Sequence, residues 1–115
     1  MSATTAGATG RVDGSVGVIE MSGQVNRHAE EAVNQAYDAV TVNGVKSIDL
    51  RFEDVEYINS TGIAVIVGVL ARARKDGLSV AAHGLTDHYK HVFQITRLSD
   101  FMTIEDDNGQ GGSGA

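Results

Sequence analysis

Apolar and polar residues alternate in blocks along the middle of the chain. Ser15–Gly23 is rich in apolar and β-branched residues and ends at glycine, which predicts a strand. Asn26 can then cap a helix, because the apolar residues that follow it fall on one helical stripe: Ala29, Ala32, Val33, Ala36, Tyr37 and Val40. In Val45–Phe52 every second residue from Ile48 onward is apolar, which predicts a second strand.

The second half of the chain continues the same alternation. Glu53–Glu56 is expected to be a short acidic loop, and a helix is predicted from about Ser60 to Lys75, ended by Asp76-Gly77. Leu78–His83 predicts a third strand. A third helix should run from Thr86 or Asp87 to about Arg97 with Tyr89, Val92, Phe93 and Thr96 facing inward, and Phe101–Asp106 can form a final strand.

This order of strands and helices predicts a single α/β domain with a mostly parallel sheet and helices packed against it. The pattern leaves room for one more strand near the N-terminus. Residues 1–14 are small and polar and residues 108–115 are glycine-rich, so we expect two flexible tails around a domain at 15–107.

Charge and composition narrow the function. The chain has 115 residues, with 9 Lys and Arg against 15 Asp and Glu, which gives a formal net charge of -6. Because nucleic acids and anionic membranes are bound through basic patches, we expect no direct binding to nucleic acid. Cysteine is absent, which excludes disulfides and thiolate metal sites. No secretory signal is visible, and the longest apolar run, Gly62–Ala71, is about half of the roughly 20 residues that a membrane helix needs, so we expect a cytoplasmic protein without membrane insertion.

The predicted helix at Ser60–Lys75 has two unusual features. From Ile63 to Ala71 it is apolar nearly all the way round, which predicts burial on more than one side, by a neighbouring helix or by a partner protein. Ser60 and Thr61 stand at its entrance, just after the carboxyl end of a strand, where α/β sheets place functional residues. One hydroxyl suffices to cap the helix, which leaves the other free to point outward.

The stretch IDLRFEDVEYINSTGIAVIVG, residues 48–68, resembles the signature of the STAS domain of bacterial anti-sigma-factor antagonists. The segments MSGQVN (21–26), ARKDGLSVAA (73–82) and VFQITRLSDFMTI (92–104) resemble further parts of the same family in the same order. The resemblance covers about Val16 to Glu105. It implies a STAS-type fold with a four- to five-stranded mixed sheet.

The resemblance also implies a regulatory binding protein that is not an enzyme and needs no cofactor or metal. In this family the dephosphorylated protein binds an anti-sigma factor that is also a serine kinase, and this releases the sigma factor that controls stress transcription. Phosphorylation of one serine ends the binding. By position that serine is Ser60, with Thr61 as the alternative. The implied partner-binding residues are Gln24, Asn26, Arg27, Asn59, Ser60, Thr61, Gly62 and Ile63, and a monomer or weak dimer is expected.

Amides replace the family's carboxylates at three of these positions: Asn59 before the serine, and Gln24 and Asn26 at the end of the early strand. This departure favours an alternative, a STAS scaffold or accessory subunit of a stress-signalling complex or transporter that does not switch. A second alternative is a small α/β domain that binds an anion at the helix entrance. His88 and His91, three residues apart with Asp87 nearby, are interpreted as solvated surface residues, because no third metal ligand is apparent.

Overall fold

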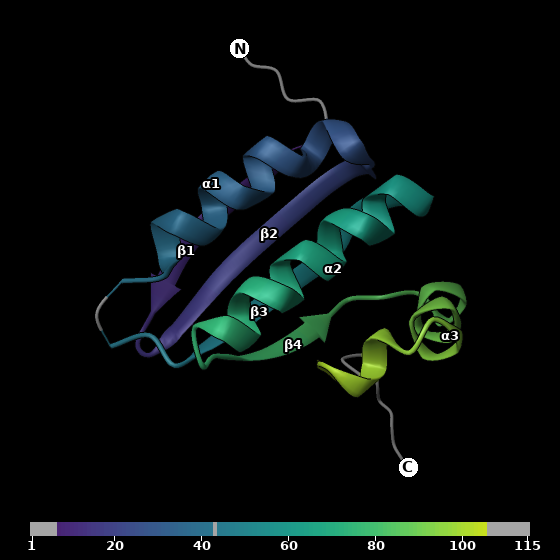
Figure 1. Cartoon of the computed structure of the whole chain (residues 1–115). Helices are drawn as coiled ribbons and strands as arrows, with labels where there is room; N and C mark the ends of the chain where they lie inside the picture. The colour runs from purple at the N-terminus through teal and green to yellow at the C-terminus, as the bar shows by residue number, and fades with distance from the viewer. Residues whose placement is uncertain (1–6, 43, 106–115) are drawn as a thin grey trace.

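The computed structural model describes residues 7–42 and 44–105, and these form one five-stranded mixed sheet with three α-helices (Figure 1). The elements follow in the order β1 (Gly7–Asp13), β2 (Val16–Val25), η1 (Arg27–Ala29), α1 (Glu30–Val40), β3 (Ser47–Ile58), α2 (Ser60–Lys75), β4 (Ser79–His83), α3 (Asp87–Ile95), η2 (Leu98–Asp100) and β5 (Thr103–Ile104). The strands lie in sequence order. β1 is antiparallel to β2, and all other neighbours are parallel, which confirms the predicted fold class.

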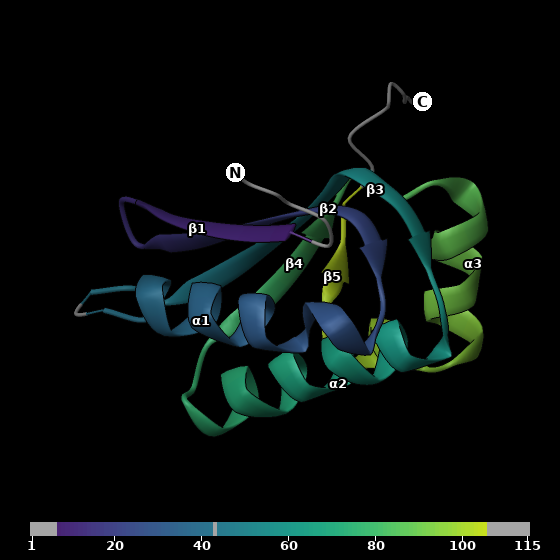
Figure 2. The same ribbon diagram turned by 90° about the horizontal axis from the view of Figure 1, so that it is seen from above.

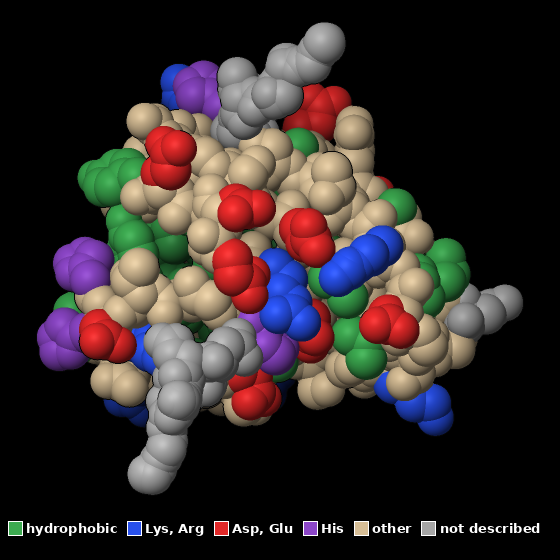
Figure 3. Space-filling view, turned by 180° about the vertical axis from the view of Figure 1, so that it is seen from behind, with side chains coloured by type: hydrophobic (Ala, Val, Ile, Leu, Met, Phe, Trp, Pro, Cys, Tyr) green, Lys and Arg blue, Asp and Glu red, His purple; other side chains and the backbone are tan. Residues whose placement is uncertain are grey.

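Helices α1 and α2 lie side by side on one face of the sheet (Figures 1 and 2). The core between them and the strands is apolar, as the alternation predicts, and among its most deeply buried side chains are Ile19, Val33, Tyr37, Ile48, Leu50, Ile66, Val69 and Phe93. The opposite face carries scattered Asp and Glu side chains with Lys and Arg among them (Figure 3). Ion pairs join some of these, such as Arg11–Glu20 at 3.2 Å and Arg51–Glu53 at 3.2 Å.

The expected N-terminal tail is the first correction. Gly7–Asp13 is not a tail but strand β1, which pairs with β2 from Gly7 opposite Ser22 to Asp13 opposite Val16. The small residues that suggested a tail allow α1 to approach the strand. A Cβ on Gly10 would lie 2.7 Å from Cγ1 of Val40 and 2.9 Å from the carbonyl oxygen of Ala36. Residues 1–6 and 108–115, also expected to be tails, lie outside the described residues.

The expected acidic loop is the second correction, because residues 53–56 belong to β3. Their side chains no longer alternate between core and solvent, yet the backbone still pairs with β2, with register shifts on the way. The alternation is lost because β4 pairs with β3 only as far as Arg51, opposite His83. Thr96 is a smaller correction, since it is exposed and follows the last residue of α3.

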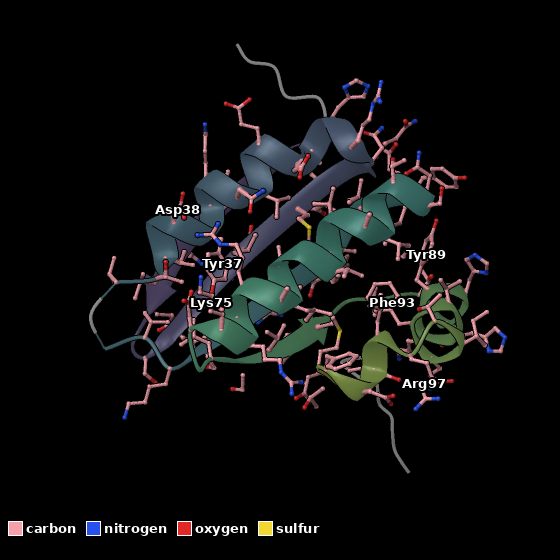
Figure 4. The ribbon with its side chains drawn as sticks, viewed as in Figure 1. Tyr37, Asp38, Lys75, Tyr89, Phe93 and Arg97 are labelled. Carbon is pink, nitrogen blue, oxygen red and sulfur yellow. The ribbon has the colours of Figure 1, made fainter. Side chains whose placement is uncertain are left out.

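A polar contact joins α1 to α2 above the apolar core. Arg72 bonds Asp38 at 2.6 Å and Asn34 at 3.1 Å, and its guanidinium lies 4.2 Å from the centre of the Tyr37 ring. The Tyr37 hydroxyl, fully buried between the two helices, donates to Asp76 at 2.7 Å (Figure 4). Burial and this bond to a carboxylate raise the pKa of Tyr37 well above its ordinary value.

Helix α3 packs against the carboxyl end of β3. The rings of Phe93 and Phe52 meet edge to face with centres 5.8 Å apart. Tyr89 lies between α3 and the start of α2 (Figure 4), and its hydroxyl accepts the backbone N–H of Ile58 at 2.9 Å. The last residue of β3, directly before the predicted site, is therefore held from both sides.

Candidate functional site

The two predicted site segments meet because β2 and β3 are parallel neighbours. Val25 lies opposite Ile58 and Gln24 opposite Tyr57, so both strands end at the same edge of the sheet. The chain leaves β3 with the backbone N–H of Asn59 donating to the Val25 carbonyl at 3.2 Å. The structure thus brings the segments Gln24–Arg27 and Asn59–Ile63 into one surface, although 31 residues separate them in the sequence.

Gly62 explains why the first turn of α2 can lie so close to β2. A Cβ at this position would overlap the Val25 carbonyl oxygen and lie 2.6 Å from the carbonyl carbon. Real Cβ atoms essentially never approach another atom closer than 3.0 Å. The glycine after the two hydroxyls is therefore required by packing between helix and strand.

Asn59, not Ser60 or Thr61, is the N-cap of α2, and this corrects the expectation that a hydroxyl caps the helix. Its Oδ1 accepts the backbone N–H of Gly62 at 2.8 Å and the hydroxyl of Thr61 at 2.7 Å. Asn caps a helix about as well as Asp does. The amide at this position therefore preserves the cap and removes one negative charge from the helix entrance.

The two hydroxyls have different environments. Thr61 donates to Asn59 and its Oγ1 also accepts the backbone N–H of Arg27 at 3.0 Å, so this hydroxyl joins η1 to α2. Ser60 is the first residue of α2 and is exposed, and within residues 7–42 and 44–105 its hydroxyl has no hydrogen-bond partner. Of the pair, Ser60 alone can be modified without breaking a contact in the described structure.

The remaining predicted residues surround Ser60. Asn26 caps η1 by accepting the backbone N–H of His28 at 2.8 Å, and Gln24 and Arg27 are exposed. Ile63 is half-buried and packs against the core, so it lies beneath the exposed surface and contributes little to it directly. All eight predicted residues therefore lie at or directly beneath one edge of the molecule.

Tyr57, which the sequence pattern did not single out, lies beside the candidate surface. Its ring is 54% exposed, opposite Gln24 and two residues before the cap. The neighbouring Asp54 and Glu56 are also exposed, which places two carboxylates on the same end of β3. Alternation with the buried Ile58 could have identified Tyr57 as outward-facing. The expectation of a loop at residues 53–56 concealed that signal.

The other side chains that could bind a metal do not come together in a cluster among the described residues. Within the described ranges, no three His, Asp or Glu side chains form a group that could hold a metal ion. His88 packs edge to face against Tyr89 with ring centres 4.8 Å apart, and His83 lies 3.4 Å from an Asp49 carboxylate oxygen. The described helices include none with the length and apolar character to cross a membrane.

Comparison with known proteins agrees with this architecture. The family model described as "Mlab, STAS domain" matches residues 9–104. The chain belongs to the STAS-domain family. The anti-sigma-B factor antagonist of Listeria monocytogenes is 27% identical to it over 92 residues, which cover 80% of this chain and 81% of that protein.

Solved STAS structures share the fold. The anti-sigma-factor antagonist SpoIIAA in its unphosphorylated form matches with a TM-score of 0.66 and 19% identity, over 86% of this chain and 87% of that one. SpoIIAA of Bacillus in its phosphorylated form matches with a TM-score of 0.65 and 20% identity, over 87% of this chain and 92% of that one. The resemblance stated from the sequence is thus confirmed.

Proposed function

We propose that this STAS protein is an anti-sigma-factor antagonist whose binding surface is the edge formed by Gln24–Arg27 and Asn59–Ile63. In this proposal it binds an anti-sigma factor with serine kinase activity, and phosphorylation of Ser60 ends the binding. The observation that carries the proposal is the free, exposed hydroxyl of Ser60 at the first position of α2, in the centre of that surface. The Listeria relative, named an anti-sigma-B factor antagonist, supports the same role.

The local structure suits a modified serine. A phosphate adds about -1.5 to -2 charges, and a helix N-terminus favours an anion through its free N–H groups and macrodipole. Because Asn59 and Thr61 hold the cap and the contact to η1, neither bond has to break when Ser60 is modified. The fold can therefore tolerate the phosphate.

A bound partner cannot tolerate a phosphate on Ser60 as well as the folded antagonist can. A partner seated on Tyr57 and the first turn of α2 would have to remove water from the phosphate or face its charge directly. A loss of about 1.4 kcal/mol in binding free energy corresponds to a tenfold change in Kd. Charge on Ser60 therefore ends binding while the antagonist itself stays folded.

The test is a binding titration with the anti-sigma kinase of the same organism. Ser60→Asp should weaken binding at least tenfold, whereas Ser60→Ala should stay close to the wild-type affinity. Ser79→Asp is the matched control, because Ser79 is also exposed but begins β4 and so lies at the amino-terminal edge of the parallel strands. Unchanged affinity of a folded Ser60→Asp variant would refute the switch.

Mass spectrometry after incubation with the kinase and ATP should place phosphate on Ser60. Loss of phosphate in Ser60→Ala, and its persistence in Thr61→Val, would support the assignment. Phosphate on Thr61 in the wild-type protein would contradict it, because the Thr61 hydroxyl already bridges Asn59 and Arg27.

A second candidate is a STAS scaffold or accessory subunit that binds a permanent partner through the same edge. Asn59 favours it, because a kinase that requires a carboxylate before the serine would find an amide. Here the protein would stay unphosphorylated after incubation with kinase and ATP, and would copurify with a stable complex.

A further inference from the structure

A groove runs along the C-terminal half of α2, on the side away from α1. Its floor is formed by the buried Leu70 and Leu98, and its walls by Val67 and Ala71 of α2 and by Thr96 and Phe101 beyond α3. It encloses about 370 Å³ and is open to solvent along one side. The chain reaches this position because η2 turns back toward α2 after α3 (Figures 1 and 2). Val67 and Phe101 remain 45% and 54% exposed, which is unusual for large apolar side chains on opposite walls of one groove.

A second hollow adjoins the first. It encloses about 250 Å³ and is lined by Leu78, Val80 and Asp100 together with three residues shared with the groove, Leu70, Arg74 and Phe101. The two hollows thus meet at Arg74 and Phe101, where the guanidinium lies 5.9 Å from the centre of the ring. The first depression is apolar, the second is about half polar and includes Asp100 in its lining, and the two form a continuous row along α2 with Arg74 between them.

The positive charge of Arg74 determines which kind of partner can bind along this row of hollows. Arg72 is paired with Asp38 and Arg97 with Asp100 at 2.8 Å, whereas Arg74 has no carboxylate partner within residues 7–42 and 44–105. An exposed cation on an apolar wall favours an occupant with a carboxylate, because opposite charges at an interface select the partner and its register.

The residues that the sequence gives after Glu105 do not have this chemistry. The ten residues after Glu105, DDNGQGGSGA, contain carboxylates but no bulky apolar side chain to fill the hollows. A second copy on a twofold axis would place one groove against the same groove and bring together two copies of Arg74. A small ligand would leave much of its surface in water, whereas small-molecule sites bury about 70–90% of theirs.

We propose that this row of hollows docks an amphipathic segment of a partner protein, with two bulky apolar side chains on one face and an Asp or Glu between them opposite Arg74. Helical side chains three or four residues apart are neighbours, about 5–6 Å between Cβ atoms, so apolar residues about seven apart with an acidic residue three or four positions after the first share one face that can reach both hollows. The segment inserts its apolar residues on either side of Phe101, and its carboxylate pairs with Arg74.

This docking surface is separate from the switch surface around Ser60. Val67, the groove residue nearest to Ser60 on α2, lies seven residues further along the helix, about 10.5 Å at 1.5 Å per residue, and Arg74 lies fourteen residues further, about 21 Å. Charge placed on Ser60 therefore does not touch the groove. In this proposal the protein can hold one partner at each end of α2.

The test uses a display library of random peptides of about 14 residues, roughly four helical turns. Selection on the wild-type protein should enrich peptides with two bulky apolar residues about seven apart and an acidic residue three or four positions after the first. Selected peptides, measured by fluorescence anisotropy, should bind Val67→Asp at least tenfold more weakly. Val12→Asp is the matched control, because Val12 is 44% exposed and Val67 is 45% exposed, and it should stay within about twofold of wild type.

Arg74→Glu supplies the charge test. It should weaken binding of the acidic peptides and accept versions in which Lys replaces the acidic residue, while Ser60→Asp should leave both affinities within about twofold. Circular dichroism confirms that each variant is folded. The proposal is overturned if the enriched peptides bind Val67→Asp as tightly as wild type, or if they show no preference for an acidic residue. A concentration-dependent dimer, measured by sedimentation, that Val67→Asp abolishes also overturns it, because the groove would then hold a second copy.

Discussion

Gly62 offers the sharpest test of how the site is built. Gly62→Ala adds a Cβ that overlaps the Val25 carbonyl oxygen, with the carbonyl carbon at 2.6 Å and Cγ2 of Ile58 at 3.1 Å. The first turn of α2 must then move away from the end of β2. That movement stretches two hydrogen bonds, from the backbone N–H of Arg27 to Thr61 at 3.0 Å and from the backbone N–H of Asn59 to Val25 at 3.2 Å.

The magnitude follows from these terms. Overpacking costs about 1–3 kcal/mol and each lost hydrogen bond about 1 kcal/mol, while replacing a helical glycine by alanine regains about 1 kcal/mol. Gly62→Ala should therefore lower the free energy of unfolding by about 2–4 kcal/mol, and the midpoint of urea unfolding by on the order of 1–2 M.

Gly68→Ala is the matched control on the same helix. No atom lies within 4 Å of a Cβ at Gly68, so this variant should gain about 0.5–1 kcal/mol from helix propensity alone. Both variants are compared by urea unfolding followed by far-UV circular dichroism. If Gly62→Ala is as stable as wild type, the close approach of α2 to β2 does not constrain the fold and the reasoning is wrong.

Three further substitutions test other contacts. Asn59→Ala should destabilise the protein by about 1 kcal/mol because the α2 cap is lost, whereas Asn59→Asp should retain the cap and gain about 0.3–1 kcal/mol from the helix dipole, as measured by urea unfolding. Tyr37→Phe should flatten the decline in stability above about pH 10. The pKa of the Tyr37 hydroxyl is higher in the folded state than in the unfolded state, so the stability that it contributes is complete below the unfolded pKa and is lost as the pH rises. Thermal melts across this pH range measure the effect. Arg97→Gly should raise the melting temperature, because Arg97 has φ 68°, a conformation that costs non-glycine residues about 1–2 kcal/mol, and its ion pair with Asp100 is exposed.

Each of these has a contrary outcome. Equal stability of Asn59→Ala and wild type would mean that the amide does not cap α2 in solution. A pH profile unchanged by Tyr37→Phe would remove the buried hydroxyl as the titrating group. Arg97→Ala, which keeps the left-handed backbone without the ion pair, should be no more stable than wild type, so a gain in that variant would contradict the role assigned to backbone strain.

Hydrophobic periodicity determined the order of elements and the extent of α2, because a helix or strand that buries one face must repeat apolar residues at its own period. The same reasoning failed for Gly7–Asp13 and for residues 53–56. Both segments are held in the sheet by backbone pairing with β2, and backbone hydrogen bonds leave no trace in side-chain periodicity.

The candidate site, too, was determined partly by the sequence and partly by the tertiary structure. The sequence alone placed Ser60 and Thr61 at a helix entrance and, through the family resemblance, named the residues around them. It could not distinguish the two hydroxyls, because the acceptor for the Thr61 proton is the cap residue Asn59 and the donor to Thr61 is the backbone of Arg27, 34 residues away. Only the tertiary structure, by ending two parallel strands at one edge, determined that Thr61 holds the site together and that Ser60 is left free.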